Sequence, residues 1–119
     1  MPKGDRIIVY EKPTCTTCRQ LAKLLREAGI EYEAVDYTVN PIPRDELARL
    51  IRMMGISARE LLRTREPAYR ELGLGREDLT EDELLDAMAE HPELVQRPIV
   101  VRGDRAVLAR PPERVKEIL

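Results

Sequence analysis

The chain of 119 residues contains no tryptophan and no phenylalanine, and its only aromatic residues are four tyrosines. Proteins that bind single-stranded nucleic acid stack its bases on aromatic side chains, so this absence argues against that function. The formal net charge is −2, with charges of both signs interspersed along the chain. This balance excludes a strongly basic surface and an acidic tail, and we expect no direct nucleic-acid partner.

Long apolar runs are also absent from the sequence. No segment approaches the roughly 20 apolar residues that span a bilayer, so we expect no membrane segment. Residues 1–6 lead into only four apolar-type residues, Ile7–Tyr10, which is too short a run for an export signal. We therefore expect a cytoplasmic protein, and the length fits one domain over residues 1–119.

Metal-ligand residues are scarce, because the chain has only Cys15, Cys18 and a single histidine, His91. A four-ligand zinc site needs more cysteine or histidine than this, so we expect no metal. We expect His91 to end one helix and cap the next turn, and nothing pairs it with Cys15. In a reducing cytosol a cysteine pair is more often catalytic or redox-sensing than a structural disulfide.

The cysteine pair lies in Cys15-Thr16-Thr17-Cys18-Arg19, between an apolar strand and an amphipathic helix. This spacing puts Cys15 at the start of the helix, where unpaired backbone N–H groups and the helix dipole favour negative charge. A thiol there has a lowered pKa, and its thiolate is the reactive form. The alternative, two small buried apolar residues, is less favoured because Pro13, Thr16, Thr17 and Arg19 make the loop stiff and polar. A strand followed by Cys-x-x-Cys at a helix start is typical of thioredoxin-like redox proteins.

The pattern along the chain predicts a mixed α/β fold. We expect strands over 6–10 and 31–37 around a helix over 16–28, which makes a βαβ unit with parallel strands. The pattern of residues 44–90 predicts a helical insertion packed on the same sheet. Its first helix is expected to have Pro43 at a first helical position and to end at Gly55. Capping-box spacing at Ser57–Glu60 and Thr80–Glu83 predicts two further helix starts.

The C-terminal part predicts an antiparallel hairpin and a last helix. We expect strands over 99–101 and 106–108 joined by a turn at Gly103-Asp104, and a helix that starts at Pro111-Pro112. The order βαβ, helices, ββα predicts a thioredoxin-like (glutaredoxin-like) mixed sheet with a helical insertion between its two halves.

One arginine stands out by its position, although most arginines of this chain belong to the solvated surface. Arg97 precedes Pro98, which precedes a predicted strand. In a thioredoxin-like fold that proline is usually cis and lies beside the redox loop, so Arg97 would project toward the thiol. A guanidinium there could bind an oxyanion through two parallel hydrogen bonds.

Several motifs spread over the chain resemble those of one family, the glutaredoxin-dependent arsenate reductases of the ArsC family, to which the Spx transcription regulators are closely related. The resemblance runs from Ile8 to Leu119. The stretches that carry it are Pro13-x-Cys15, Arg44–Leu47, Met54–Ser57, Leu61–Arg63, Glu71–Leu74, His91-Pro92, Arg97–Val101, Arg110-Pro111 and Glu117–Leu119.

The resemblance implies a reaction and a set of site residues. Cys15 would attack arsenate, and Arg63, Arg97 and Arg110 would bind the oxyanion. Glutathione would then reduce the adduct and release arsenite, glutaredoxin would clear the resulting mixed disulfide, and no cofactor would stay bound.

Three departures from the family pattern leave alternatives open. Cys18 stands where the best-known reductases of this class carry serine, so Cys18 could resolve the intermediate and thioredoxin could replace glutathione. Glu11-Lys12 replaces the family's His-Asn; Lys12 could lower the pKa of Cys15, and Glu11 would oppose it. The Spx regulators also carry the Cys-x-x-Cys-Arg pattern, here ending at Arg19, and an arginine at the position of Arg65. In those regulators the cysteine pair is a redox switch, and the partner is RNA polymerase. A third hypothesis is a general disulfide reductase.

Overall fold

The computed structural model describes residues 6–119, and its internal contacts divide them into two compact units. The first unit combines residues 6–40 with residues 97–119, and the second consists of residues 41–96. The expectation that no export signal begins at Met1–Asp5 lies outside the described residues. A single domain over residues 1–119 stays a prediction.

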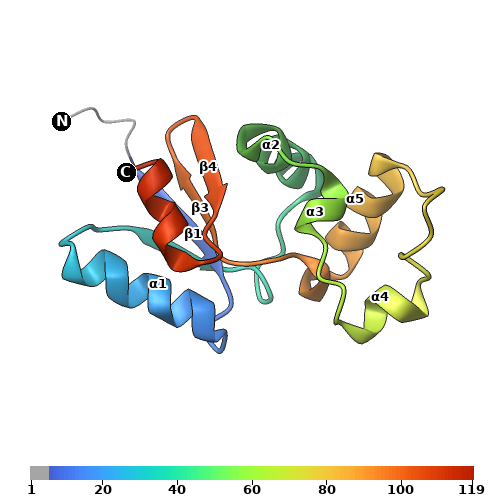
Figure 1. Ribbon diagram of the computed structural model, residues 1–119, viewed down its shortest axis with the longest axis horizontal. Helices are drawn as coiled ribbons and strands as arrows, with labels where there is room; N and C mark the ends of the chain where they lie inside the picture. Colours follow the sequence, from blue (N-terminus) through green and yellow to red (C-terminus); the bar gives the residue numbers. More distant parts are fainter. Residues whose placement is uncertain (1–5) are drawn as a thin grey trace. The chain divides into compact units, whose positions relative to one another are not determined.

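A four-stranded sheet with strand order β2-β1-β3-β4 forms the centre of the first unit (Figure 1). Strand β1 pairs with β2 in parallel and with β3 antiparallel, and β3 pairs antiparallel with β4. The predicted parallel pair and the predicted hairpin at Gly103 are confirmed, although β2 is shorter than the predicted 31–37. The strands are β1 Ile7–Glu11, β2 Glu33–Asp36, β3 Ile99–Arg102 and β4 Arg105–Leu108.

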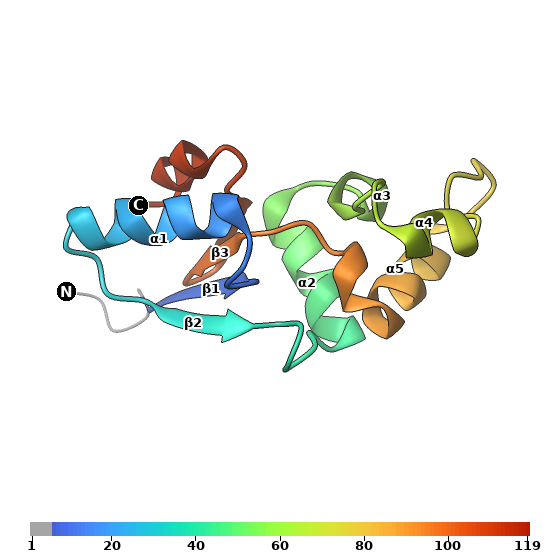
Figure 2. The ribbon, with the colours of Figure 1, turned by 90° about the horizontal axis from the view of Figure 1, so that it is seen from below.

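Two helical segments cover one face of this sheet, α1 at Thr16–Glu27 and a 3-10 helix, η2, at Pro112–Glu117 (Figure 2). Their apolar side chains build a core with the strands that includes Val9, Leu21 and Val115, none more than 1% exposed. The sequence predicts a helix that starts at Pro111-Pro112. It is instead a six-residue 3-10 helix, the form that short terminal segments commonly take.

The second unit is helical, as the sequence predicts for residues 44–90. Its first helix ends at Gly55, whose φ of 69° lies in the left-handed region. Both predicted capping boxes are present, at Ser57 with Glu60 and at Thr80 with Glu83. The elements are α2 Arg44–Met54, α3 Ala58–Leu61, α4 Pro67–Glu71, α5 Glu81–Glu90 and the 3-10 helix η1 Pro92–Leu94.

Two details of the second unit concern the residues at helix ends. Pro43 is the N-cap of α2 and not its first helical residue, because its ψ of 152° is extended. His91 is the C-cap of α5 and directly precedes η1, as expected. Within residues 6–119, no helix has the length and apolar content needed to cross a membrane.

Candidate active site

The thiol of Cys15 lies at the N-terminus of α1, as the sequence predicts. Cys15 is the N-cap residue of that helix, and its Sγ accepts a hydrogen bond from the backbone N–H of Cys18 at 3.4 Å. The backbone N–H of Cys15 donates to the carbonyl of Lys12 at 2.9 Å, which closes the loop that connects β1 to α1. Both cysteines are free thiols; Cys15 is half-buried, whereas Cys18 is 2% exposed.

The two thiols differ strongly in acidity. Burial acts to raise the pKa of Cys15, but hydrogen bonds from Cys18 and Arg97 and the charge of Arg97 outweigh it and lower that pKa to about 7. Burial raises the pKa of Cys18 to about 12, with further contributions from Cys15 and the charge of Glu11, against an opposing hydrogen bond from the Lys12 backbone. At neutral pH about half of the accessible Cys15 is therefore ionised, whereas the buried Cys18 is protonated.

Arg97 projects toward the Cys15 thiol, and its peptide bond to Pro98 is cis, as expected for the fold. Arg97 is 8% exposed, and its guanidinium forms hydrogen bonds with Cys15 and with the hydroxyl of Tyr37. Burial opposes its charge, but these two partners outweigh burial and raise the pKa of Arg97. Its Nε has no hydrogen-bond partner among the described residues, so a donor remains for a ligand.

Arg110 belongs to the same unit as Cys15 and Arg97. Its Nη1 donates to the backbone carbonyl of Arg97 at 2.9 Å, so it holds the residue that contacts the thiol. The Arg110–Pro111 peptide bond is also cis. The structure thus brings four predicted site residues together in one unit: Cys15, Cys18, Arg97 and Arg110.

Arg63, the third predicted oxyanion-binding arginine, belongs to the second unit. Its backbone N–H donates to the carbonyl of Leu94 at 2.7 Å, beside a bridge between Leu62 and Val95. Its Nη2 lies 3.5 Å from a carboxylate oxygen of Glu66, and its buried Nε has no partner among residues 6–119. Like Arg97, it keeps an unused donor.

The supporting residues predicted from sequence differ in their surroundings. Lys12 is half-buried, and its backbone forms a hydrogen bond that acts to lower the pKa of Cys18, while Arg19 is exposed on α1. Burial, together with the neighbouring charge of Asp36, raises the pKa of Glu11 at the end of β1. That Lys12 lowers the pKa of Cys15 through its side chain stays a prediction.

The residue that sequence analysis missed is Tyr37, which it assigned only to the end of a strand. The side chain of Tyr37 is fully buried and is hydrogen-bonded to Arg97. A sequence signal existed, because an aromatic residue with a polar tip ends the strand predicted over 31–37. That signal does not identify Arg97 as the hydrogen-bond partner of Tyr37, since Arg97 is far away in the sequence.

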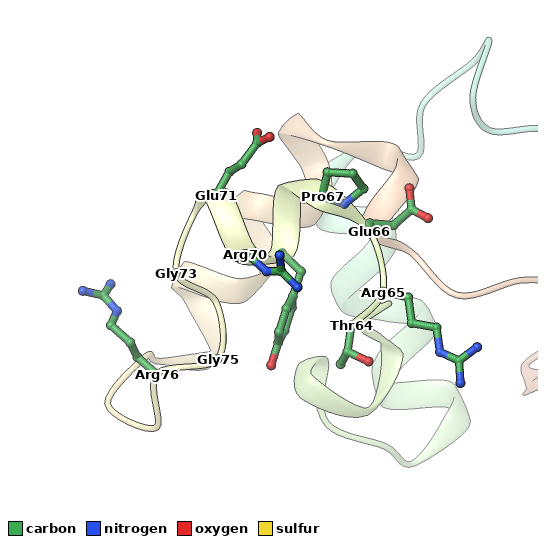
Figure 3. Close-up of a pocket in the computed structure, with 10 residues that line it drawn as sticks. Thr64, Arg65, Glu66, Pro67, Arg70, Glu71, Gly73, Gly75 and Arg76 are labelled. Atoms are coloured by element: carbon green, nitrogen blue, oxygen red, sulfur yellow. The ribbon is translucent and has the colours of Figure 1, made fainter.

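A separate hollow of about 800 Å³ lies in the second unit, around α4 and the turn that follows it (Figure 3). Three arginines line it, yet Figure 3 shows Arg65 and Arg76 extending away from each other on opposite sides. The ring of Tyr69 packs under Gly75, where an added Cβ would lie 3.1 Å from the hydroxyl. Because these guanidinium groups do not converge, the hollow lacks the arrangement that grips a small oxyanion.

Residues 6–119 contain no cluster of three or more histidine, cysteine, aspartate or glutamate side chains arranged to hold an ion.

A family model described as the ArsC family matches residues 10–118. The chain belongs to the ArsC family. The arsenate reductase of Acidiphilium multivorum is 45% identical over 115 residues, which are 97% of this chain and 82% of that protein. The Escherichia coli K12 protein YfgD is 41% identical over 96% of this chain and 97% of its own length.

Solved structures agree with the family assignment. The arsenate reductase structure from Vibrio cholerae superposes with a TM-score of 0.93 at 39% identity, and covers 98% of this chain and all of that one. This ArsC-family member therefore has the predicted thioredoxin-like fold with a helical insertion. Its relatives identify it as an arsenate reductase-like oxidoreductase.

Proposed function

We propose that this protein reduces arsenate, with Cys15 as the nucleophile. One observation carries the proposal: a half-buried thiol with a pKa of about 7 stands at a helix N-terminus beside the buried guanidinium of Arg97. A thiolate alone would repel an anionic substrate. The adjacent guanidinium both favours the thiolate and supplies the positive charge that an oxyanion needs.

Three arginines bind the oxyanion in this proposal. Arg97 offers its unpartnered Nε, and Arg110, which is hydrogen-bonded to the carbonyl of Arg97, adds positive charge. Arg63 is assigned by its place in the family motif Leu61–Arg63, and it too has a buried Nε without a partner among the described residues. Arsenate is a tetrahedral oxyanion, and the planar guanidinium fork suits its pairs of oxygens.

The reaction begins when the Cys15 thiolate attacks the arsenic atom. A sulfur–arsenic bond forms, and an arsenate oxygen leaves as water after it takes up protons. A second thiolate then attacks the Cys15 sulfur, and the sulfur–arsenic bond breaks with its electron pair on arsenic. Arsenic passes from As(V) to As(III) and leaves as arsenite, while the two sulfur atoms are oxidised to a disulfide.

The second thiolate has two possible sources, and we propose that Cys18 supplies it in the same chain. Cys18 lies within hydrogen-bond reach of Cys15, and its pKa is raised by burial and by the charge of the Cys15 thiolate. The contribution of that charge ends once the Cys15 sulfur is bonded to arsenic. Thioredoxin would then reduce the Cys15–Cys18 disulfide. In the other route glutathione forms a mixed disulfide with Cys15, and glutaredoxin clears it. Both routes belong to the reducing cytoplasm.

The test is arsenate-dependent NADPH consumption by the pure protein. It is run with thioredoxin and its reductase, and in parallel with glutathione, glutaredoxin and glutathione reductase. We expect turnover with thioredoxin that is lost in both Cys15→Ser and Cys18→Ser. Turnover only with glutathione, retained in Cys18→Ser, would overturn the internal route, and no turnover in either system would overturn arsenate reduction.

The cysteine pair itself favours one second candidate, a redox switch of the Spx type. In that case oxidation to a Cys15–Cys18 disulfide would change the affinity for RNA polymerase, the partner that the resemblance implies. Affinity capture of RNA polymerase by the reduced and the oxidised protein tests this. Equal recovery in both states, or none in either, would contradict the switch.

A general disulfide reductase would reduce insulin disulfides regardless of arsenate.

A further inference from the structure

Tyr37 directly follows strand β2, and its backbone N–H donates to the carbonyl of Glu11 at 3.3 Å. This bond extends the pairing of β1 with β2 by one position, because Glu11 already pairs with Asp36. The side chain of Tyr37 has no exposed surface. A tyrosine buried this deeply needs a partner for its hydroxyl, since an unsatisfied one destabilises the fold.

One partner of this side chain is the guanidinium of Arg97, which donates to the hydroxyl oxygen of Tyr37. The same guanidinium forms a hydrogen bond with the Cys15 thiol. At its other end, the backbone carbonyl of Arg97 accepts from Nη1 of Arg110 at 2.9 Å. Arg97 is thereby held at both ends, and its Nε remains without a partner among residues 6–119.

We propose that Tyr37 is a positioning residue, whose hydroxyl orients the Arg97 guanidinium so that it faces Cys15 and leaves its free N–H donor available to an oxyanion. Without this bond the long arginine side chain would sample several rotamers, and each binding event would have to order it again. With the bond, the donor is oriented before the ligand arrives. The oxyanion part of the proposal rests on the proposed function, whereas the contact with the thiol does not.

The substitution Tyr37→Phe removes the hydroxyl and keeps the ring that fills the core. We expect a fall of about three- to tenfold in the rate of Cys15 alkylation by iodoacetamide at pH 7, because the less well-held guanidinium stabilises less thiolate. A full pH profile of that rate should shift to higher pH. The KM for arsenate should rise about tenfold, with a smaller change in kcat.

Tyr32→Phe is the matched control, because Tyr32 is a half-buried tyrosine of the same unit that packs at the edge of the core. It should leave the alkylation profile and the KM unchanged. The decisive comparison places Tyr37→Phe in an Arg97→Ala background, where it should have no further effect on the profile. An undiminished effect there would show that Tyr37 acts by general packing and would overturn the proposal.

An unchanged profile in the single variant Tyr37→Phe would also overturn the proposal. The alkylation measurement uses the protein without arsenate, so it gives a result even when no arsenate is turned over. Failure of the proposed function and failure of the Tyr37 assignment are therefore distinguishable. Thermal unfolding of each variant identifies any loss of the fold.

Discussion

The Sγ of Cys15 accepts a hydrogen bond from the backbone N–H of Cys18, one helical turn further along α1. This contact fixes the Cys15 sulfur against the first turn of α1, and the Cys18 side chain also lies within hydrogen-bond reach of it. Their different burial gives the two thiols unequal acidity. The acceptor is the half-buried sulfur, which faces Arg97, and the donor belongs to a residue buried in the core.

The pH dependence of alkylation should report the lowered pKa of Cys15. We expect the rate of iodoacetamide labelling to rise with a midpoint near pH 7, with all modification at Cys15, because Cys18 has a pKa of about 12 and is buried. Cys18→Ala removes the side-chain hydrogen bond and should move the midpoint upward, whereas Cys18→Ser can restore a donor. Peptide mass analysis identifies the labelled residue. Substantial labelling of Cys18 at pH 7 in the folded protein would refute this assignment.

Loss of Arg97 should weaken both thiolate stability and substrate binding. We expect Arg97→Ala to lower kcat/KM for arsenate about 100-fold, since one buried charge-assisted donor is removed from the reacting centre. Arg114→Ala is the control, because Arg114 is exposed and pairs with Glu117 on η2. It should change kcat/KM by less than about twofold. Equal losses in both variants would contradict a specific role of Arg97.

Stability should depend on pH in opposite directions for the two cysteines. Cys15 has a folded pKa of about 7, below its usual value of 9.0, so its contribution is complete above pH 9 and is lost as pH falls through 7. Cys18 has a folded pKa of about 12, above the same usual value, so its contribution is present below pH 9 and is lost as pH rises toward 12.

Urea unfolding at several pH values measures these two contributions. Between about pH 7 and 9, the free energy of unfolding of the unsubstituted protein should rise relative to that of Cys15→Ser. Above pH 9 it should fall relative to that of Cys18→Ser. A difference between the unsubstituted protein and Cys15→Ser that stays flat from pH 6 to 9 would mean that the Cys15 pKa is the same in the folded and unfolded states.

Local sequence signals predicted the helices and strands because the interactions concerned span only a few residues. The apolar spacing of Leu21, Leu24 and Leu25 predicts one face of α1, and Ser57 with Glu60 predicts the start of α3. Where the sequence signal is weaker, the observed elements differ from the predicted ones. Pro43 is the N-cap of α2 and lies outside the helix, and the last helix is a short 3-10 segment. Proline restricts φ but leaves ψ free, so its exact place at a helix start is not determined locally.

By itself the sequence determined which residue is the candidate nucleophile, where it lies relative to a helix start, and which family the motifs resemble. Only the tertiary structure decided how acidic each thiol is and what holds Arg97. Those properties depend on burial and on hydrogen bonds between residues distant in the chain, such as Tyr37 and Arg97. The pairing of β1 with β2 and β3 brings these residues together, and sequence spacing carries no record of such a contact.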